Sequence, residues 1–224
     1  MCGRYSLTQS GEAIAVNFSL FESPVLAPQY NIAPTQQVSA ILATAESPQP
    51  HHRQLRWGLI PGWAKDKTIG NRLINARAET VAEKPSFRSA FKRRRCLIVA
   101  DGFYEWQRQE KQKQPFYIQL RDRAPFAFAG LWERWQDGAS GEATYSCTIL
   151  TTAPNTLMAP IHNRMPVILP AAAYEPWLDP DLTHGSSLNV LLRPFDADRM
   201  SSYPVSTHVN NPRHNDPGCL APLS

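Results

Sequence analysis

The chain has 224 residues, of which 42% are hydrophobic and 19% charged, and its formal net charge is +4. This length and composition are typical of a globular protein with a core of its own, and the charge permits a polyanionic partner without requiring one. No stretch approaches roughly eighteen apolar residues, and no basic segment followed by an apolar one opens the chain, so we expect no membrane span and a cytoplasmic location.

The first chemical feature is a cysteine at position 2. Aminopeptidases remove Met1 when the next side chain is small, so we expect the mature chain to begin with Cys2. Its α-amine (pKa ~8) and its thiol (pKa ~8.5, a few per cent ionised at neutral pH) would then lie on adjacent carbons. Such a pair can attack an acyl group with the thiol, or condense with an aldehyde to an imine and then a thiazolidine ring. A cysteine at this position can also be without function.

Few segments have helical periodicity. A helix capped by Thr8 or Ser10 is expected near the N-terminus. A second helix is expected to begin at Pro85, with the basic run 92–95 on its solvent face. The chain from residue 179 onward is expected to be largely irregular.

Most of the chain predicts short strands. Runs rich in β-branched and aromatic residues, bounded by proline, glycine and polar clusters, are typical of sheet proteins. In chain order, strands are expected at 37–44, 54–60, 97–100, 103–107, 115–120, 125–132, 144–151 and 167–169. This pattern predicts one α+β domain over residues 1–224, built on an antiparallel, barrel-like β-sheet with a few short helices.

The four cysteines do not have the spacing of metal ligands. We therefore predict no structural zinc site and no bound metal. Cys96 and Cys147 lie in apolar, strand-like runs and are expected in the core. The pair His51-His52 is expected in an exposed loop. No glycine-rich phosphate-binding motif is present, so we expect no nucleotide cofactor.

A reactive N-terminal cysteine needs an acid–base partner and groups that orient its substrate. Glu105, between two aromatic residues on an expected strand, is one candidate, although an edge strand would leave it in solvent. His162 follows a short turn capped by Asn155 and is a second candidate. Arg77 and Arg164 can bind an anion or pair with surface carboxylates. Taken singly, none of these signals is specific.

Several motifs in a fixed order are more specific together than apart. They are Cys2-Gly3-Arg4, Asn31-Ile32-Ala33-Pro34, Trp57-Gly58-Leu59-Ile60-Pro61, Ile74-Asn75-Ala76-Arg77-Ala78-Glu79-Thr80, Ala100-Asp101-Gly102-Phe103-Tyr104-Glu105-Trp106, Ile161-His162-Asn163-Arg164-Met165-Pro166 and Val209-Asn210-Asn211-Pro212. The series resembles the SOS response-associated peptidase (SRAP) family in its bacterial form, from Cys2 to about Pro222.

The resemblance implies a sensor of abasic sites in single-stranded DNA that links to them covalently through Cys2 and shields them from strand cleavage. By motif match, the family's other catalytic residues fall on Asn75, Glu105 and His162. Positions that contact or shape the DNA site fall on Arg4, Asn31, Trp63, Arg77, Trp106, Thr151 and Arg164. A second tryptophan that some members carry after position 63 is replaced here by Ala64, so the aromatic side chain that stacks on the bases stays open.

The resemblance also implies partners and a location. We expect binding to single-stranded DNA with abasic sites, including at single-/double-strand junctions, by a monomer associated with the bacterial nucleoid. One alternative is an N-terminal nucleophile hydrolase or amidotransferase, in which the thiol of Cys2 forms an acyl-enzyme. A peptidase activity also stays open, whether or not it extends beyond the chain's own removal of Met1, as does a plain single-strand binder.

Overall fold

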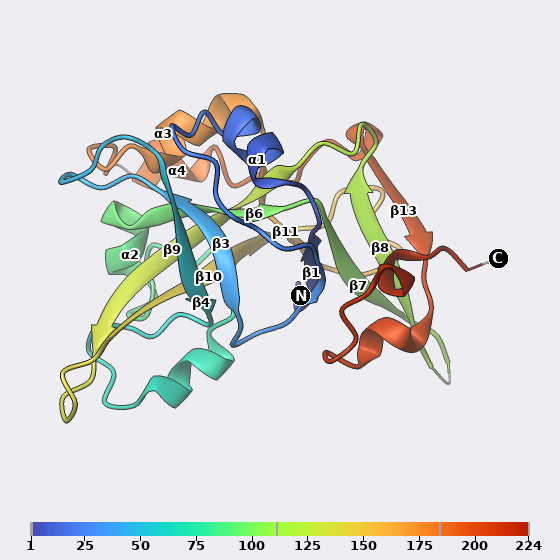
Figure 1. Cartoon of the computed structure of the whole chain (residues 1–224), viewed down its shortest axis with the longest axis horizontal. Helices are drawn as coiled ribbons and strands as arrows, with labels where there is room; N and C mark the ends of the chain where they lie inside the picture. The colour runs from blue at the N-terminus through green and yellow to red at the C-terminus, as the bar shows by residue number, and fades with distance from the viewer. Residues whose placement is uncertain (1, 111, 184, 224) are drawn as a thin grey trace.

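Two β-sheets make up most of the fold (Figure 1). The computed structural model describes residues 2–110, 112–183 and 185–223. The smaller sheet contains, in spatial order, β13 (Met200–Pro204), β8 (Lys113–Leu120), β7 (Gly102–Arg108), β1 (Tyr5–Leu7) and β2 (Gln29–Ile32). The larger sheet contains β11 (Met165–Pro166), β10 (Ala143–Thr152), β4 (His51–Trp57), β3 (Gln37–Leu42), β6 (Arg95–Ala100), β9 (Phe126–Gln136) and β12 (Ile168–Leu169), with β5 (Asn75–Arg77) beside β10.

The larger sheet closes into a barrel. Strand β10 pairs with β4 on one edge and with β9 on the other, and the pairings β4–β3, β3–β6 and β6–β9 complete the ring. Closure satisfies the strand edges that an open sheet would leave unpaired. The barrel-like sheet expected from the sequence is confirmed, but β10 runs parallel to both β4 and β5 rather than antiparallel.

The core fills the barrel and continues under the smaller sheet. Tyr5 of β1 packs edge-on against Trp57 and Phe128 of the barrel, with ring centroids 5.3 and 5.6 Å apart. Cys96 and Cys147 are fully buried, as expected from their apolar runs. Because β1 is packed against the barrel, the N-terminal residues are held between the two sheets.

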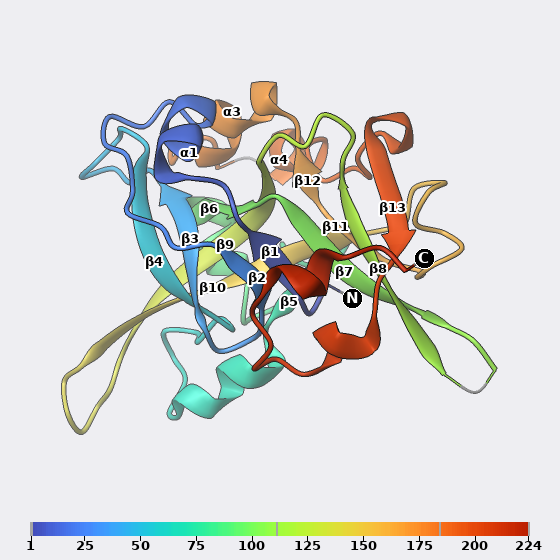
Figure 2. The ribbon, with the colours of Figure 1, turned by 45° about the vertical axis from the view of Figure 1, so that its right-hand side comes forward.

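Short helices cover one end of the barrel, where α1 (Gly11–Asn17), α3 (Tyr174–Leu178) and α4 (Gly185–Asn189) lie together (Figures 1 and 2). The Ser10 hydroxyl accepts a hydrogen bond from the Ala13 amide at 3.3 Å, so the expected cap of the first helix is confirmed. Phe18 stacks on Tyr174 at 5.1 Å and joins α1 to α3. Within the described ranges, no helix is long and apolar enough to cross a membrane. The remaining helical elements are α2 (Arg88–Arg93), η1 (Lys67–Arg72), η2 (Ala171–Ala173), η3 (Ala197–Arg199), η4 (Thr207–Asn210) and η5 (Pro217–Leu220).

The expectation that the whole basic run 92–95 is solvated is wrong at Arg95. This residue begins β6, is 2% exposed, and donates hydrogen bonds to the carbonyls of Phe91, Lys92 and Trp177 at 2.7–2.9 Å. Burial lowers the pKa of its guanidinium to about 10. A pattern of like charges cannot show that one member turns inward to cap the end of a helix.

Three further expectations differ from the structure. The second helix begins at Arg88 rather than Pro85. His51 and His52 lie in β4, where they pair with Leu42 and Ile41 of β3, and not in a loop. The chain beyond residue 179 contains α4 and β13, which completes the smaller sheet along β8.

Candidate active site around Cys2

The start of the chain is anchored by a buried polar cluster on β1. The Asp101 carboxylate accepts hydrogen bonds from the hydroxyls of Ser6 and Thr8, both at 2.6 Å, and from the Thr8 amide at 2.5 Å. The Ser6 hydroxyl also lies 2.8 Å from the Tyr117 hydroxyl. Tyr5 pairs with strands on both sides, β2 and β7. These contacts fix the position of β1 and, with it, the direction in which residues 2–4 leave the strand.

Cys2 is fully buried, and Asn75 holds its backbone. The Asn75 side-chain amide donates to the Cys2 carbonyl at 2.8 Å. The Asn75 Oδ1 atom is also buried and has no hydrogen-bond partner among the described residues. Asn75 opens β5, whose register is set by pairing with Ile149 of β10. One side of the amide thus positions the cysteine, and the other is able to accept a hydrogen bond from a ligand.

The thiol of Cys2 is held protonated. Burial raises its pKa well above the usual range, and the neighbouring Glu105 carboxylate raises it further. Its sulfur contacts the Arg4 carbonyl at 4.0 Å. An anion at this position would be both desolvated and close to a carboxylate, so the folded chain disfavours the thiolate of Cys2.

Glu105 lies in the interior, not on a solvent-facing edge. It is 3% exposed, and its strand β7 has neighbours on both sides. The Trp106 amide donates to Glu105 Oε1 at 3.3 Å. Its carboxylate is near enough to the Cys2 thiol to raise the pKa of that thiol. A buried carboxylate next to a nucleophile is suited to proton transfer.

His162 lies at the end of a turn between β10 and β11. Asn155 caps this turn by accepting from the Met158 amide at 2.9 Å, and the His162 amide donates to the Met158 carbonyl at 2.9 Å. The His162 Nδ1 atom accepts from the Arg164 amide at 3.0 Å. The same nitrogen lies 3.2 Å from the Arg164 carbonyl, so the backbone of Arg164 fixes the orientation of the imidazole. Gln107 ties the turn to β7 by donating to the Pro160 carbonyl at 3.0 Å.

Arg4 and Asn31 are linked to the C-terminal segment, the residues 205–223 that follow β13. Arg4 donates to Asn31 Oδ1 at 2.8 Å and to the Val209 carbonyl at 2.9 Å, and its guanidinium lies 6.0 Å from the ring centre of Trp106. The indole of Trp106 donates to Asn210 Oδ1 at 2.8 Å. Asn31 is 2% exposed, so its amide is turned into the protein, where it holds Arg4.

Arg164 is held in an ion pair with Glu79. Its guanidinium donates to both carboxylate oxygens of Glu79, at 2.7 and 2.9 Å, and to the Thr151 carbonyl at 2.5 Å. Thr151 is buried, and its hydroxyl contacts the same arginine at 3.2 Å. Arg77, by contrast, is exposed at the end of β5, and Trp63 is 61% exposed in the loop after β4. These two side chains are the most accessible of the expected DNA-binding residues.

Two participants were missed at the level of sequence. Glu79 had no assigned role beyond its place in the motif at 74–80, whereas in the structure it neutralises Arg164. The motif at 209–212 had no assigned role, and its backbone carbonyls prove to be acceptors for Arg4 and Asn31. The position of the motif in the series was the only available signal, because backbone acceptors leave no side-chain pattern.

Comparison with known proteins decides the family. The profile of the SOS response associated peptidase (SRAP) family matches residues 1–212. The chain belongs to the SRAP family. It is 46% identical over 221 residues to the abasic site processing protein YoqW of Bacillus subtilis, covering 97% of each chain. It is 47% identical over 219 residues to the abasic site processing protein YoaM of the same organism, covering 96% of this chain and 95% of YoaM.

A solved structure has the same fold. The crystal structure of a protein from Bacteroides thetaiotaomicron superposes with a TM-score of 0.88 at 29% identity and covers 100% of both chains. The SRAP fold accordingly extends over the barrel, the smaller sheet and the C-terminal segment together.

Proposed function

We propose that this SRAP protein processes abasic sites in single-stranded DNA by forming a covalent link through Cys2 after Met1 is removed. The observation that carries the proposal is that Asn75 of β5 and Glu105 of β7 meet at Cys2, which precedes β1. The names of YoqW and YoaM, both abasic site processing proteins, support the same substrate. An abasic sugar presents an aldehyde in its open form, which is the group that a 1,2-aminothiol captures.

In the proposed reaction, His162 acts first on the sugar. As a general acid, its imidazole gives a proton to the ring oxygen, so that the closed sugar opens to the aldehyde. The Cys2 amine adds to C1′ and gives a carbinolamine. The Glu105 carboxylate takes the proton that the amine nitrogen loses and passes it to the departing hydroxyl, so that water leaves and an imine forms. Asn75 keeps the Cys2 carbonyl in place and accepts a hydrogen bond from a sugar hydroxyl at its buried Oδ1 atom.

The thiol acts second. Sulfur bonds to C1′ across the imine, and the thiol proton ends on the nitrogen, which closes a thiazolidine ring without any further reactant. The raised pKa of the Cys2 thiol makes it a weak nucleophile in the resting protein. The amine therefore attacks first, and the thiol reacts only after the imine has formed. Ring closure also removes the imine that would acidify C2′ and permit β-elimination of the strand.

DNA binding in this proposal is electrostatic and based on stacking. In this proposal the exposed Arg77 and the partly exposed Arg4 contact phosphates, and the exposed Trp63 stacks on a base; their accessibility supports these roles. Arg164 contacts the DNA only when a phosphate displaces the Glu79 carboxylate from its guanidinium. The net charge of +4 supports attraction to a polyanion of any sequence.

The hydrolase alternative has less support. It depends on Cys2 followed by Gly3, whereas the family match extends over residues 1–212. An acyl-enzyme mechanism requires a ready thiolate, and the Cys2 thiol is buried with a raised pKa. Removal of Met1 by the chain itself stays compatible with the proposal.

The deciding experiment uses an oligonucleotide with a single abasic site and a denaturing gel. Protein whose N-terminal Cys2 is verified by intact mass should give a shifted, heat-resistant band, and Cys2→Ala protein should give none while still binding intact single-stranded DNA. Cys2→Ser keeps the amine, so it should form an imine that borohydride traps and should cleave part of the strand. A full yield of stable adduct from Cys2→Ala protein would refute the proposal.

A further inference from the structure

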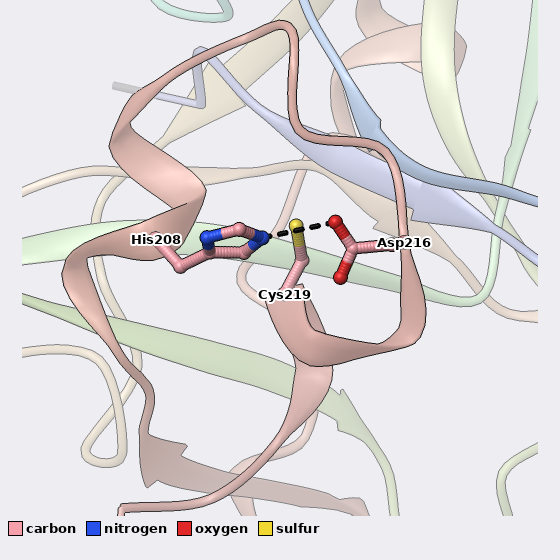
Figure 3. Close-up of side chains that lie close together, drawn as sticks. All are labelled: His208, Asp216 and Cys219. Carbon is pink, nitrogen blue, oxygen red and sulfur yellow. Dashed lines mark hydrogen bonds and ion pairs between the residues drawn. The ribbon is translucent and has the colours of Figure 1, made fainter.

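A histidine, an aspartate and a cysteine converge in the C-terminal segment, outside the site around Cys2. Figure 3 shows His208, Asp216 and Cys219 pointing toward one another. Their donor atoms all lie within 4.8 Å of one another, and His208 Nε2 is 2.9 Å from Asp216 Oδ2. We propose that these three side chains form a binding site for a zinc ion.

The local backbone orients each of the three groups. Asp216 caps η5 by accepting from the Gly218 amide with Oδ1 at 2.9 Å, which leaves Oδ2 directed at His208. The Cys219 amide donates to the Asp216 carbonyl at 3.0 Å, so carboxylate and thiol come from one turn. His208 stacks on His214, with ring centroids 3.9 Å apart, and this contact fixes the plane of its imidazole.

The ligand set and the spacing suit zinc. Imidazole, carboxylate and thiolate are the zinc ligands of proteins, and around a tetrahedral ion the donor atoms lie roughly 3.4–3.7 Å apart. The cluster therefore needs only a slight opening of the His208–Asp216 contact and a slight approach of Cys219. The thiol is buried while Asp216 is exposed, so a fourth position for water faces solvent. The thiol distinguishes this cluster from an ordinary surface ion pair.

A metal here would clip the base of a loop that supports the candidate active site. Residues 209–215 lie between the ligands His208 and Asp216, and they supply the carbonyls that hold Arg4 and Asn31. Joining the two ends of this loop removes conformational freedom from the unclipped chain. The zinc site itself does not depend on the proposed function, because its tests measure metal and not DNA.

The first test is titration of metal-free protein with Co²⁺, a spectroscopic substitute for zinc. We expect a single equivalent to produce a near-ultraviolet charge-transfer band from a thiolate–cobalt bond, together with the visible bands of a tetrahedral ion, and Zn²⁺ to displace both. Cys219→Ser should remove the charge-transfer band. His208→Gln and Asp216→Asn should each weaken binding by about tenfold or more.

Two control variants identify the ligands. Cys2→Ser and His51→Gln, which alter a cysteine and a histidine outside the cluster, should keep the full spectrum. If Cys219→Ser fails to fold, the ligand variants His208→Gln and Asp216→Asn still test the site. The proposed site would be overturned by the absence of a thiolate–cobalt band in wild-type protein or by its loss in Cys2→Ser. It would also be overturned if His208→Gln and Asp216→Asn bound Co²⁺ as tightly as wild type does.

The second test is local. Hydrogen exchange with and without Zn²⁺ should show slower exchange of the amides in 209–215, with the barrel strands unchanged. At about a hundredfold excess of zinc over Kd, the Tm should rise by about 5–10 °C in wild type and by far less in Cys219→Ser. Zinc binding without slower exchange in 209–215 would overturn the role of the ion as a clip for this loop.

Discussion

Asn31→Ala tests whether a residue expected to bind DNA acts instead through the protein. The two N–H groups of the Asn31 amide are shared by the carbonyls of Val209, Asn211 and His214, at 3.2, 3.1 and 2.8 Å, and its Oδ1 accepts from Arg4 at 2.8 Å. The side chain is 2% exposed, so water does not replace these contacts after truncation. The substitution should therefore loosen the C-terminal segment.

The size of the effect follows from the contacts. Two neutral hydrogen bonds at ~1 kcal/mol each and one to a charged group at ~1.5 kcal/mol sum to about 3.5 kcal/mol, from which Arg4 recovers a part through its remaining bond to Val209. A net loss of about 3 kcal/mol lowers the Tm of a domain of this size by roughly 6–12 °C.

Calorimetry on wild type, Asn31→Ala and the control Asn17→Ala would measure this loss. Asn17 is exposed at the end of α1, and its truncation should change stability by less than about 0.5 kcal/mol. If Asn31→Ala is as stable as the control but loses affinity for single-stranded DNA, Asn31 contacts the DNA and its bracing role is wrong.

Three other substitutions probe the remaining parts of the site. Glu79→Gln frees the charge of Arg164, so fluorescence anisotropy should show tighter binding of intact single-stranded DNA and a steeper salt dependence; an unchanged slope would contradict the competition between Glu79 and phosphate. Because Arg164 lowers the pKa of Glu79, their mutual stabilisation is complete above the unfolded pKa and is lost as pH falls through the lower folded pKa, so the urea stability difference between wild type and Glu79→Gln should shrink in acid. Trp63→Ala should leave Tm nearly unchanged and cost about 1–3 kcal/mol of DNA affinity; a large fall in Tm would show that the ring is structural. Gly102→Ala should lower Tm markedly, since the added carbon would lie 2.0 Å from the Tyr117 hydroxyl, and an unchanged Tm would show that the Tyr117 side chain can move to accommodate it.

The local parts of the fold were predictable because their causes are local. The cap at Ser10 depends on one hydroxyl and the amide of Ala13, and the barrel strands alternate with turn residues that the sequence displays. Arg95 and His51 were misplaced because tertiary partners decide their positions. Arg95 is buried by the carbonyls that it satisfies, and His51 becomes a strand residue by pairing with Leu42. The Trp177 carbonyl is remote from Arg95 in sequence, and backbone carbonyls leave no side-chain signal.

The candidate site divides in the same way. The motif series indicated which residues belong together, but not the contacts by which they meet. Asn75 reaches the Cys2 carbonyl because β5 pairs in parallel with β10, a register that the sequence does not display. The ion pair of Arg164 with Glu79 was left open as one of two alternatives, since spacing alone does not distinguish a phosphate contact from a carboxylate contact.

Burial of Cys2 has a chemical consequence for the proposed mechanism. A thiol whose pKa is raised by desolvation and by Glu105 is a poor first nucleophile at neutral pH, whereas an α-amine with a pKa of ~8 is partly unprotonated there. The same Glu105 that disfavours the thiolate can accept its proton once an imine carbon lies next to the sulfur. The arrangement therefore favours amine attack before ring closure, and it keeps the thiol from reacting with other electrophiles until an abasic sugar is bound.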